Sequence, residues 1–209
     1  MSAAAIRIAG NDDRLAHGMA RKGVNMFSQR SERLVQNIVG ATTLKSFLTA
    51  VEKTYAGRIV VWGRGDRLTG SRTDGWAVVL GVTNNEDLRV MMFTFDGRCQ
   101  SRKVTAHQSK IIVKRHVLAR MMQRSTGTGN AEVAGYRVGR HIEGLFEFLG
   151  REDMVEGAQF RLSGFGGAIC GAIENNLIIV KTWLSSASIS DTKARAKAEA
   201  DEWTMEVSQ

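Results

Sequence analysis

The amino-acid sequence predicts an α+β fold with three parts: a helical N-terminal part, a mostly antiparallel sheet with a packed helix, and a C-terminal tail helix. Apolar residues recur at three- and four-residue steps over 28–55, short β-branched and aromatic runs dominate the middle of the chain, and the end is rich in Ala, Lys, Arg and Glu. Accordingly, we divide the chain into a helical N-terminal segment (1–56), an α+β core with a basic helix (57–185) and a solvated tail helix (186–209).

The N-terminal segment is predicted to contain two helices. Residues 1–25 show no clear periodicity, so we interpret them as loosely packed. The helical pattern of residues 28–55 is interrupted near Gly40, and Gly57 is a suitable end for the second helix. The chain has no proline, so its turns depend on its 22 glycines together with Asn and Asp.

The core is predicted to be built from short strands joined by tight turns. The expected strands are 58–62, 76–83, 88–95, 109–113, 160–162, 168–173 and 177–184. Asn-rich connections at 84–87 and 174–176 predict antiparallel hairpins.

Three helices are expected beyond the N-terminal segment. They cover 114–124, then 133–149 as one helix or as two interrupted at Gly139, and finally a tail helix that begins at the cap Asp191 and runs to about Met205. Trp203 is expected to be an exposed aromatic residue on the polar tail helix, which indicates a docking contact.

The positive charge is concentrated in one interval. The formal net charge is +8, yet no acidic residue lies between Asp96 and Glu132, so residues 97–131 account for all of it. The eight cations of this interval are Arg98, Arg102, Lys103, Lys110, Lys114, Arg115, Arg120 and Arg124. Because like charges repel, an anionic ligand is expected to supply the missing counter-charge. Nucleic acid, with RNA favoured, is the leading partner class.

The predicted helix 114–124 presents a polar face that could carry chemistry. His116, Arg120, Gln123 and Arg124 fall at i, i+4, i+7 and i+8, which places them on one side. The opposite face is apolar and is expected to pack against the sheet: Val117, Leu118, Met121 and Met122. Imidazole transfers protons near neutral pH, and guanidinium stabilises phosphate charge. This combination suits metal-independent RNA cleavage, so we expect no cofactor and no metal site.

A resemblance supports this interpretation. A strand followed by His116-x-x-x-Arg120-x-x-x-Arg124, with a later hairpin whose strand 177–184 contains Thr, resembles small ribonuclease toxins of the barnase, colicin and RelE-like group. The resemblance covers about residues 76–184. It implies that His116 is the acid or base, that Arg120 and Arg124 bind phosphate, and that Thr182 with Lys181 positions the scissile phosphate.

The chain departs from this group in three respects. Arg115 precedes the histidine where a small residue is frequent, Val117 follows it where alanine is frequent, and the region before residue 57 has no counterpart in the minimal toxin domain. That region is interpreted as an accessory, regulatory or oligomerising part.

Two other functions remain open at this stage. One is a non-catalytic RNA- or DNA-binding protein of phage or mobile-element type, in which the cations at 98–115 and Lys181 contact the nucleic-acid backbone. The other is an assembly protein whose basic surface meets an acidic protein partner. A protein partner could also bind through the N-terminal helices or through the Trp203 tail helix. His107 is a weaker candidate for a second proton carrier, and no role is assigned to His17 or His141.

The sequence also predicts a compartment. Its apolar runs are far shorter than a membrane span, and its first residues lack a secretory apolar core. With only two cysteines, Cys99 and Cys170, a reducing and therefore cytoplasmic location without membrane partners is expected.

Overall fold

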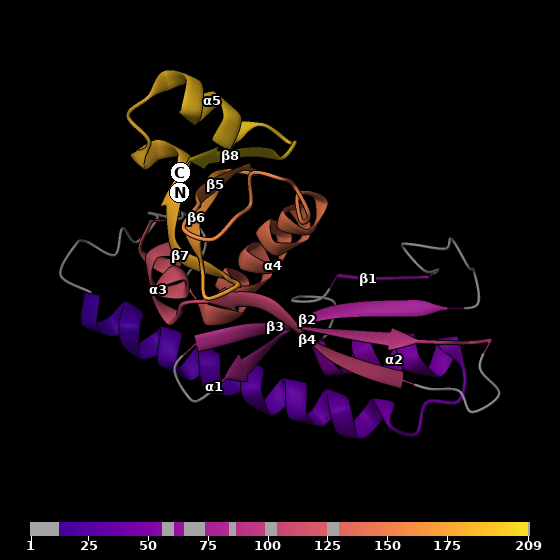
Figure 1. Cartoon of the computed structure of the whole chain (residues 1–209). Helices are drawn as coiled ribbons and strands as arrows, with labels where there is room; N and C mark the ends of the chain where they lie inside the picture. The colour runs from indigo at the N-terminus through magenta and orange to yellow at the C-terminus, as the bar shows by residue number, and fades with distance from the viewer. Residues whose placement is uncertain are drawn as a thin grey trace.

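The computed structural model describes residues 13–55, 61–64, 74–83, 87–98, 104–124 and 130–208, and it confirms the α+β class (Figure 1). The described helices are α1 (Asp13–Ile38), α2 (Leu44–Tyr55), α3 (Arg115–Arg124), α4 (Ala131–Glu147) and α5 (Thr192–Glu199), with a 3₁₀ turn at Ser186–Ser188. The described strands are β1 (Val61–Arg64), β2 (Gly75–Thr83), β3 (Asp87–Phe95), β4 (Val104–Val113), β5 (Gln159–Gly164), β6 (Gly167–Glu174), β7 (Leu177–Ser185) and β8 (Thr204–Ser208).

These strands form one sheet in the order β1-β2-β3-β4-β7-β6-β5-β8. Neighbouring strands are antiparallel except β4 and β7, which run parallel over Ile111–Val113. Both predicted hairpins, β2–β3 and β6–β7, are confirmed. In the second, Asn175 and Asn176 have φ of 53° and 58°, the left-handed conformation of a type I′ turn. Their backbone N–H groups donate to the Glu156 carboxylate.

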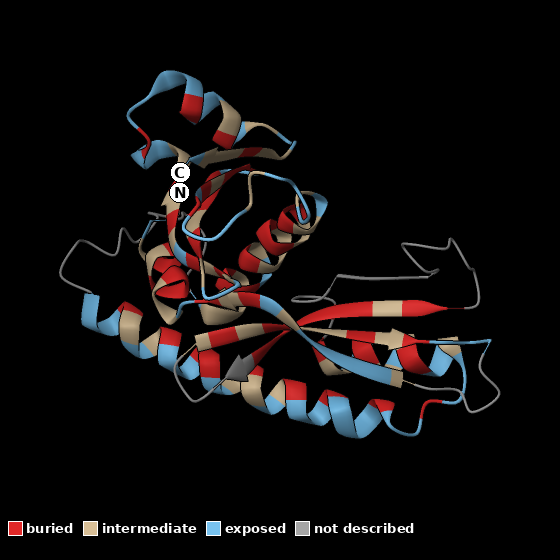
Figure 2. Cartoon of the chain, viewed as in Figure 1, coloured by how far each residue is buried: buried red, intermediate tan, exposed pale blue. Residues whose placement is uncertain are grey.

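The helices cover the sheet in two groups. In Figure 1, α1 and α2 extend along β2–β4, whereas α3 and α4 lie beside the upright strands β5–β7. Figure 2 shows buried residues on the helix sides that face the strands. Nearly all buried apolar side chains belong to one cluster, which joins the helical part to the sheet.

The first half of α1 contradicts the prediction of a loosely packed segment. Residues 13–25 are helical because small residues form a stripe that buries against the rest of the molecule: Ala16, Ala20, Gly23 and Val24. The predicted break before α2 is confirmed. There Thr43 and Ser46 form a reciprocal cap, with the Ser46 backbone N–H donating to Thr43 Oγ1 at 3.1 Å and the Thr43 backbone N–H donating to Ser46 Oγ at 3.0 Å.

Several predicted boundaries in the core are adjusted. β4 begins at Val104 rather than at residue 109. The prediction missed the first half of this strand because that half is exposed and lacks the apolar alternation of a half-buried strand. α4 is a single helix without a break at Gly139. The predictions at Gly57 and at residues 58–60 lie outside the described residues.

The end of the chain is a helix followed by a strand, which corrects the predicted tail helix. Asp191 caps α5 as expected, since its Oδ1 accepts from the Ala194 backbone N–H at 2.6 Å. The helix ends at Glu199, and β8 then pairs with β5. Trp203 is half-buried and packs inside the molecule, with ring centroids 5.0 Å from His141 and 4.4 Å from Phe165. The predicted docking role of an exposed Trp203 is therefore wrong.

None of the described helices combines the length and the apolar character that crossing a membrane requires.

Candidate functional site

Helix α3 is fixed in position by its apolar side and by the sheet. The chain leaves β4 beside β7, where the Lys114 backbone N–H donates to the Val180 carbonyl oxygen at 2.9 Å. As predicted, the apolar side of α3 is buried in the core: Val117, Leu118, Ala119, Met121 and Met122. His116, Arg120 and Gln123 are half-buried on the other side, and Arg124 is exposed. Packing therefore holds this polar face rigidly at the surface.

Hydrogen bonds connect the polar side chains of α3. Arg120 Nε donates to His116 Nε2 at 3.0 Å, and Arg120 Nη1 donates to Gln123 Oε1 at 3.2 Å. Gln123 Nε2 in turn donates to Asp13 Oδ1 at the beginning of α1. The guanidinium of Arg120 thus lies between an imidazole and an amide. The carboxylate of Asp13, from another helix, is the last member of this series of hydrogen bonds. We call Asp13, His17, His116, Arg120 and Gln123 the α1–α3 cluster.

Helix α1 supplies a second imidazole. The ring of His17 stacks on that of His116, with centroids 5.7 Å apart and planes inclined by 27°. His17 lies one turn after Asp13, so both residues occupy the side of α1 next to α3. Sequence reasoning missed both, because it took residues 1–25 to be a loosely packed segment without clear periodicity. The four-residue spacing of Ala16, Ala20 and Val24 was the available signal for a helix there.

The surroundings of His116 keep its imidazole neutral. Burial lowers its pKa most, and the positive charges of Arg120, His17 and Arg124 lower it further, while Asp13 opposes them. A lowered pKa agrees with the hydrogen bond from Arg120, since a neutral ring nitrogen must accept it.

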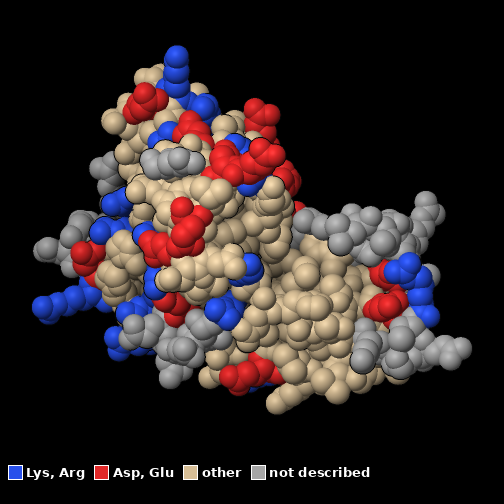
Figure 3. All heavy atoms as spheres, in the orientation of Figure 1, with Lys and Arg blue, Asp and Glu red and all other residues tan. Residues whose placement is uncertain are grey.

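Further cations lie next to the cluster. Arg14 and Arg21 are exposed and stand three residues before and four residues after His17, on adjoining positions of α1. Figure 3 shows several Lys and Arg side chains on the left of the molecule, where α1 begins and α3 lies, with acidic side chains among them. Sequence reasoning overlooked α1 as a source of positive charge for the site.

Part of the acid-free interval is neutralised by acids from elsewhere in the chain, so two of its eight cations need no ligand as counter-charge. Arg98 pairs with Asp74 at 2.9 Å, and Lys114 pairs with Asp87 at 2.8 Å. Asp87 also accepts from the backbone N–H of Arg115 at 3.2 Å.

Other cations remain without an acidic partner. Within the described part of the chain, no carboxylate forms an ion pair with the side chains of Lys110, Arg115, Arg120 or Arg124. Three of these four cations, Arg115, Arg120 and Arg124, belong to α3. Arg102 and Lys103 lie outside the described residues.

Thr182 and Lys181 are not joined to the α1–α3 cluster. Thr182 lies opposite Cys170 in the β6–β7 ladder, and Cys170 lies opposite Arg161, so the three side chains share one face of the sheet. Lys181 pairs with Glu174. Among the described residues, no hydrogen bond links either side chain to His116 or Arg120.

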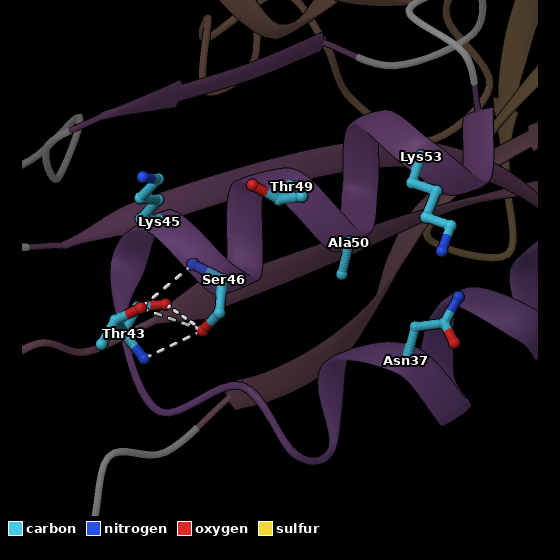
Figure 4. A pocket seen from close by; sticks show the side chains of 7 residues that line it. All are labelled: Asn37, Thr43, Lys45, Ser46, Thr49, Ala50 and Lys53. Carbon is cyan, nitrogen blue, oxygen red and sulfur yellow. Dashed lines mark hydrogen bonds between the residues drawn. The ribbon is translucent and has the colours of Figure 1, made fainter.

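Two described hollows lie elsewhere. One, of about 420 Å³, is formed by the end of α1 and by α2 (Figure 4). Its residues are Asn37, Thr43, Lys45, Ser46, Thr49, Ala50 and Lys53. Asn37 is roughly 30 Å along α1 from His17 at 1.5 Å per residue. Another hollow, of about 370 Å³, lies on the sheet face that carries Arg161 and Glu206. Across the described residues, no group of three or more His, Cys, Asp or Glu side chains could hold a metal ion.

Comparison with known proteins gave no match to a family model, to a curated protein or to a solved structure. The α1–α3 cluster is therefore interpreted from its own chemistry.

Proposed function

We propose that this protein is a toxin-like endoribonuclease that cleaves RNA without a metal ion at the α1–α3 cluster. The observation that carries the proposal is the stacked pair His17 and His116 beside Arg120. Two imidazoles provide groups that exchange protons near neutral pH, and the nearby guanidiniums of Arg120 and Arg124 bind phosphate oxygens.

The chemistry needs only groups of this cluster, the neighbouring Arg124 and a proton from solvent. An imidazole takes the proton of a ribose 2′-hydroxyl, and the 2′ oxygen forms a bond to the adjacent phosphorus. The bond from phosphorus to the 5′ oxygen breaks, and that oxygen takes a proton from solvent. The products are a 2′,3′-cyclic phosphate and a 5′-hydroxyl. Arg120 and Arg124 stabilise the extra negative charge on phosphorus during the transfer.

One observation favours the alternative of a protein that binds nucleic acid without cutting it. Because Arg120 Nε already donates a hydrogen bond to Nε2 of His116, this ring nitrogen is not free to take a proton. A binding protein would use the same cations for backbone contacts, and its affinity would fall steeply with salt.

A cytoplasmic location is also part of the proposal. Among the described residues, Cys170 is half-buried and has a free thiol, which is compatible with a compartment in which thiols stay reduced.

The test is incubation of the purified chain with total RNA in the presence of EDTA. We expect fragments from the wild type, and a loss of at least about 100-fold in rate for His116→Ala, because one proton-transferring or phosphate-contacting group is typically worth that much. His107→Ala is the matched control, since His107 is an exposed histidine on β4 outside the cluster. Intact RNA after incubation with the wild type would overturn the proposal. Tight, salt-sensitive binding of uncut RNA would establish the alternative.

A further inference from the structure

We propose that the two imidazoles of the α1–α3 cluster have separate roles. The hydrogen bond from Arg120 keeps the proton of His116 on Nδ1, so that His116 acts as a hydrogen-bond donor. His17 is the group that accepts the proton of the 2′-hydroxyl. This inference rests on the proposed function and assigns the roles within it.

The hydrogen bond from Arg120 determines which nitrogen of His116 carries the proton. A guanidinium has donors and no acceptor, and it stays protonated at every relevant pH. Because Arg120 Nε donates to His116 Nε2, that nitrogen must be unprotonated. The proton of the neutral ring therefore resides on Nδ1. Protonation of Nε2 would bring two N–H groups into opposition, so His116 is a poor proton acceptor in this arrangement.

Gln123 and Asp13 fix the arginine in this arrangement. The Gln123 amide turns its oxygen to Arg120 and its nitrogen to Asp13, which allows one orientation of the amide. Gln123 and Asp13 are thus positioning residues that act on His116 through Arg120.

The charged groups around His116 support its neutral form from both helices. From α3, Arg120 and Arg124 disfavour a charged ring, and from α1, His17 does the same while Asp13 alone favours it. The balance is toward a lower pKa for His116.

His17 lacks such a constraint. Among the described residues, no hydrogen-bond donor occupies either of its ring nitrogens, and its only described ring contact is the stack on His116. The groups around it are His116 and Asp13, together with Arg14 and Arg21 at adjoining positions of its helix. His17 therefore has a nitrogen available to take the 2′-hydroxyl proton.

The assignment completes the proton balance of the reaction. His17 accepts the 2′-hydroxyl proton while the 2′ oxygen bonds to phosphorus and the 5′ oxygen leaves. The leaving oxygen takes a proton from water, and the imidazolium of His17 then returns its proton to the hydroxide so formed. His116 stays neutral throughout and donates a hydrogen bond from Nδ1 to a phosphate oxygen.

The same replacement at each imidazole tests the assignment. Asparagine can donate a hydrogen bond and cannot take a proton at neutral pH. His17→Asn should therefore lower the rate of RNA cleavage by about 100-fold or more, whereas His116→Asn should stay within about tenfold of the wild type. Equal losses, or a larger loss for His116→Asn, would overturn the assignment. Far-ultraviolet circular dichroism of both variants confirms that the fold is retained.

A second measurement does not depend on activity. Nitrogen-15 NMR of the histidine rings in the full chain should show His116 with its proton on Nδ1 and with a pKa below that of a free histidine. Gln123→Ala should convert His116 to a mixture of the two neutral forms, while His107→Ala should leave its spectrum unchanged. A proton on Nε2 of His116 in the wild type would overturn the inference. If Nδ1 carries the proton and the wild type cuts no RNA, the proposed function fails, and the role of His17 fails with it.

Discussion

Two histidines of this protein have a lowered pKa with burial as the main cause, and they differ in what lies around them. His141 is buried, its Nδ1 lies 2.9 Å from the Arg137 carbonyl oxygen, and its ring makes a T-shaped contact with the ring of Trp203. Burial is the main cause of its lowered pKa. His116 is only half-buried, and its pKa is lowered by burial together with neighbouring positive charge. The first is a core histidine with a structural role, and the second belongs to the candidate site. Sequence reasoning could not separate them, because burial depends on the whole fold.

The burial of His141 predicts that stability depends on pH. A histidine whose pKa is lower in the folded state binds fewer protons there than in the unfolded chain, where its pKa is about 6.5. The contribution of neutral His141 to stability is complete above the unfolded-state pKa of about 6.5, and it is lost as the pH falls toward the lower folded-state pKa. Urea unfolding between about pH 7.5 and pH 5 should therefore show a falling free energy of unfolding, with at most about 1.4 kcal/mol per pH unit from this one group.

His141→Gln should flatten that pH dependence, even if it also lowers stability at every pH. His107→Ala, at an exposed histidine of β4, is the control variant. An equally steep slope in the His141 variant would show that this residue is not the cause.

At the scale of the elements, turns were predicted better than the ends of helices. Asn175 and Asn176 mark their hairpin directly, because their left-handed backbone favours this residue type. The N-terminal half of α1 was missed because its buried stripe is made of alanine and glycine, which hydrophobic periodicity underrates. β8 was missed because its pairing with β5, about 45 residues away, is not visible in the local sequence.

A close approach of α1 and α4 makes a prediction about packing. A Cβ added to Gly135 in α4 would lie 2.4 Å from Cζ of Phe27, a fully buried ring of α1. Gly135→Ala should lower the free energy of unfolding by about 1–3 kcal/mol, because the core cannot take the extra atom without a shift. In Gly18→Ala the new Cβ meets no atom within 4 Å, so helix propensity should raise stability by about 0.5–1 kcal/mol. Chemical denaturation of both variants measures the difference. A Gly135→Ala variant as stable as the wild type would contradict the packing described here.

At the scale of the whole molecule, the charge pattern of the sequence located one half of the site. It identified α3 and the shared face of His116 and Arg120, because helical spacing alone determines them. The other half comes from α1, since Asp13 meets Gln123 across 110 positions of sequence. The sequence also overstated the free charge, because Asp74, just before β2, pairs with Arg98, and Asp87, at the start of β3, pairs with Lys114.

The central claim is that the α1–α3 cluster uses the ribose 2′-hydroxyl of RNA as the attacking group. An oligonucleotide with a single ribose in an otherwise 2′-deoxy chain tests it most directly. We expect one cut, immediately 3′ of the ribose, that leaves a 2′,3′-cyclic phosphate, persists in EDTA and disappears in His17→Asn. Cutting at deoxynucleotides, or no cut at the ribose by a protein that binds the oligonucleotide, would contradict it.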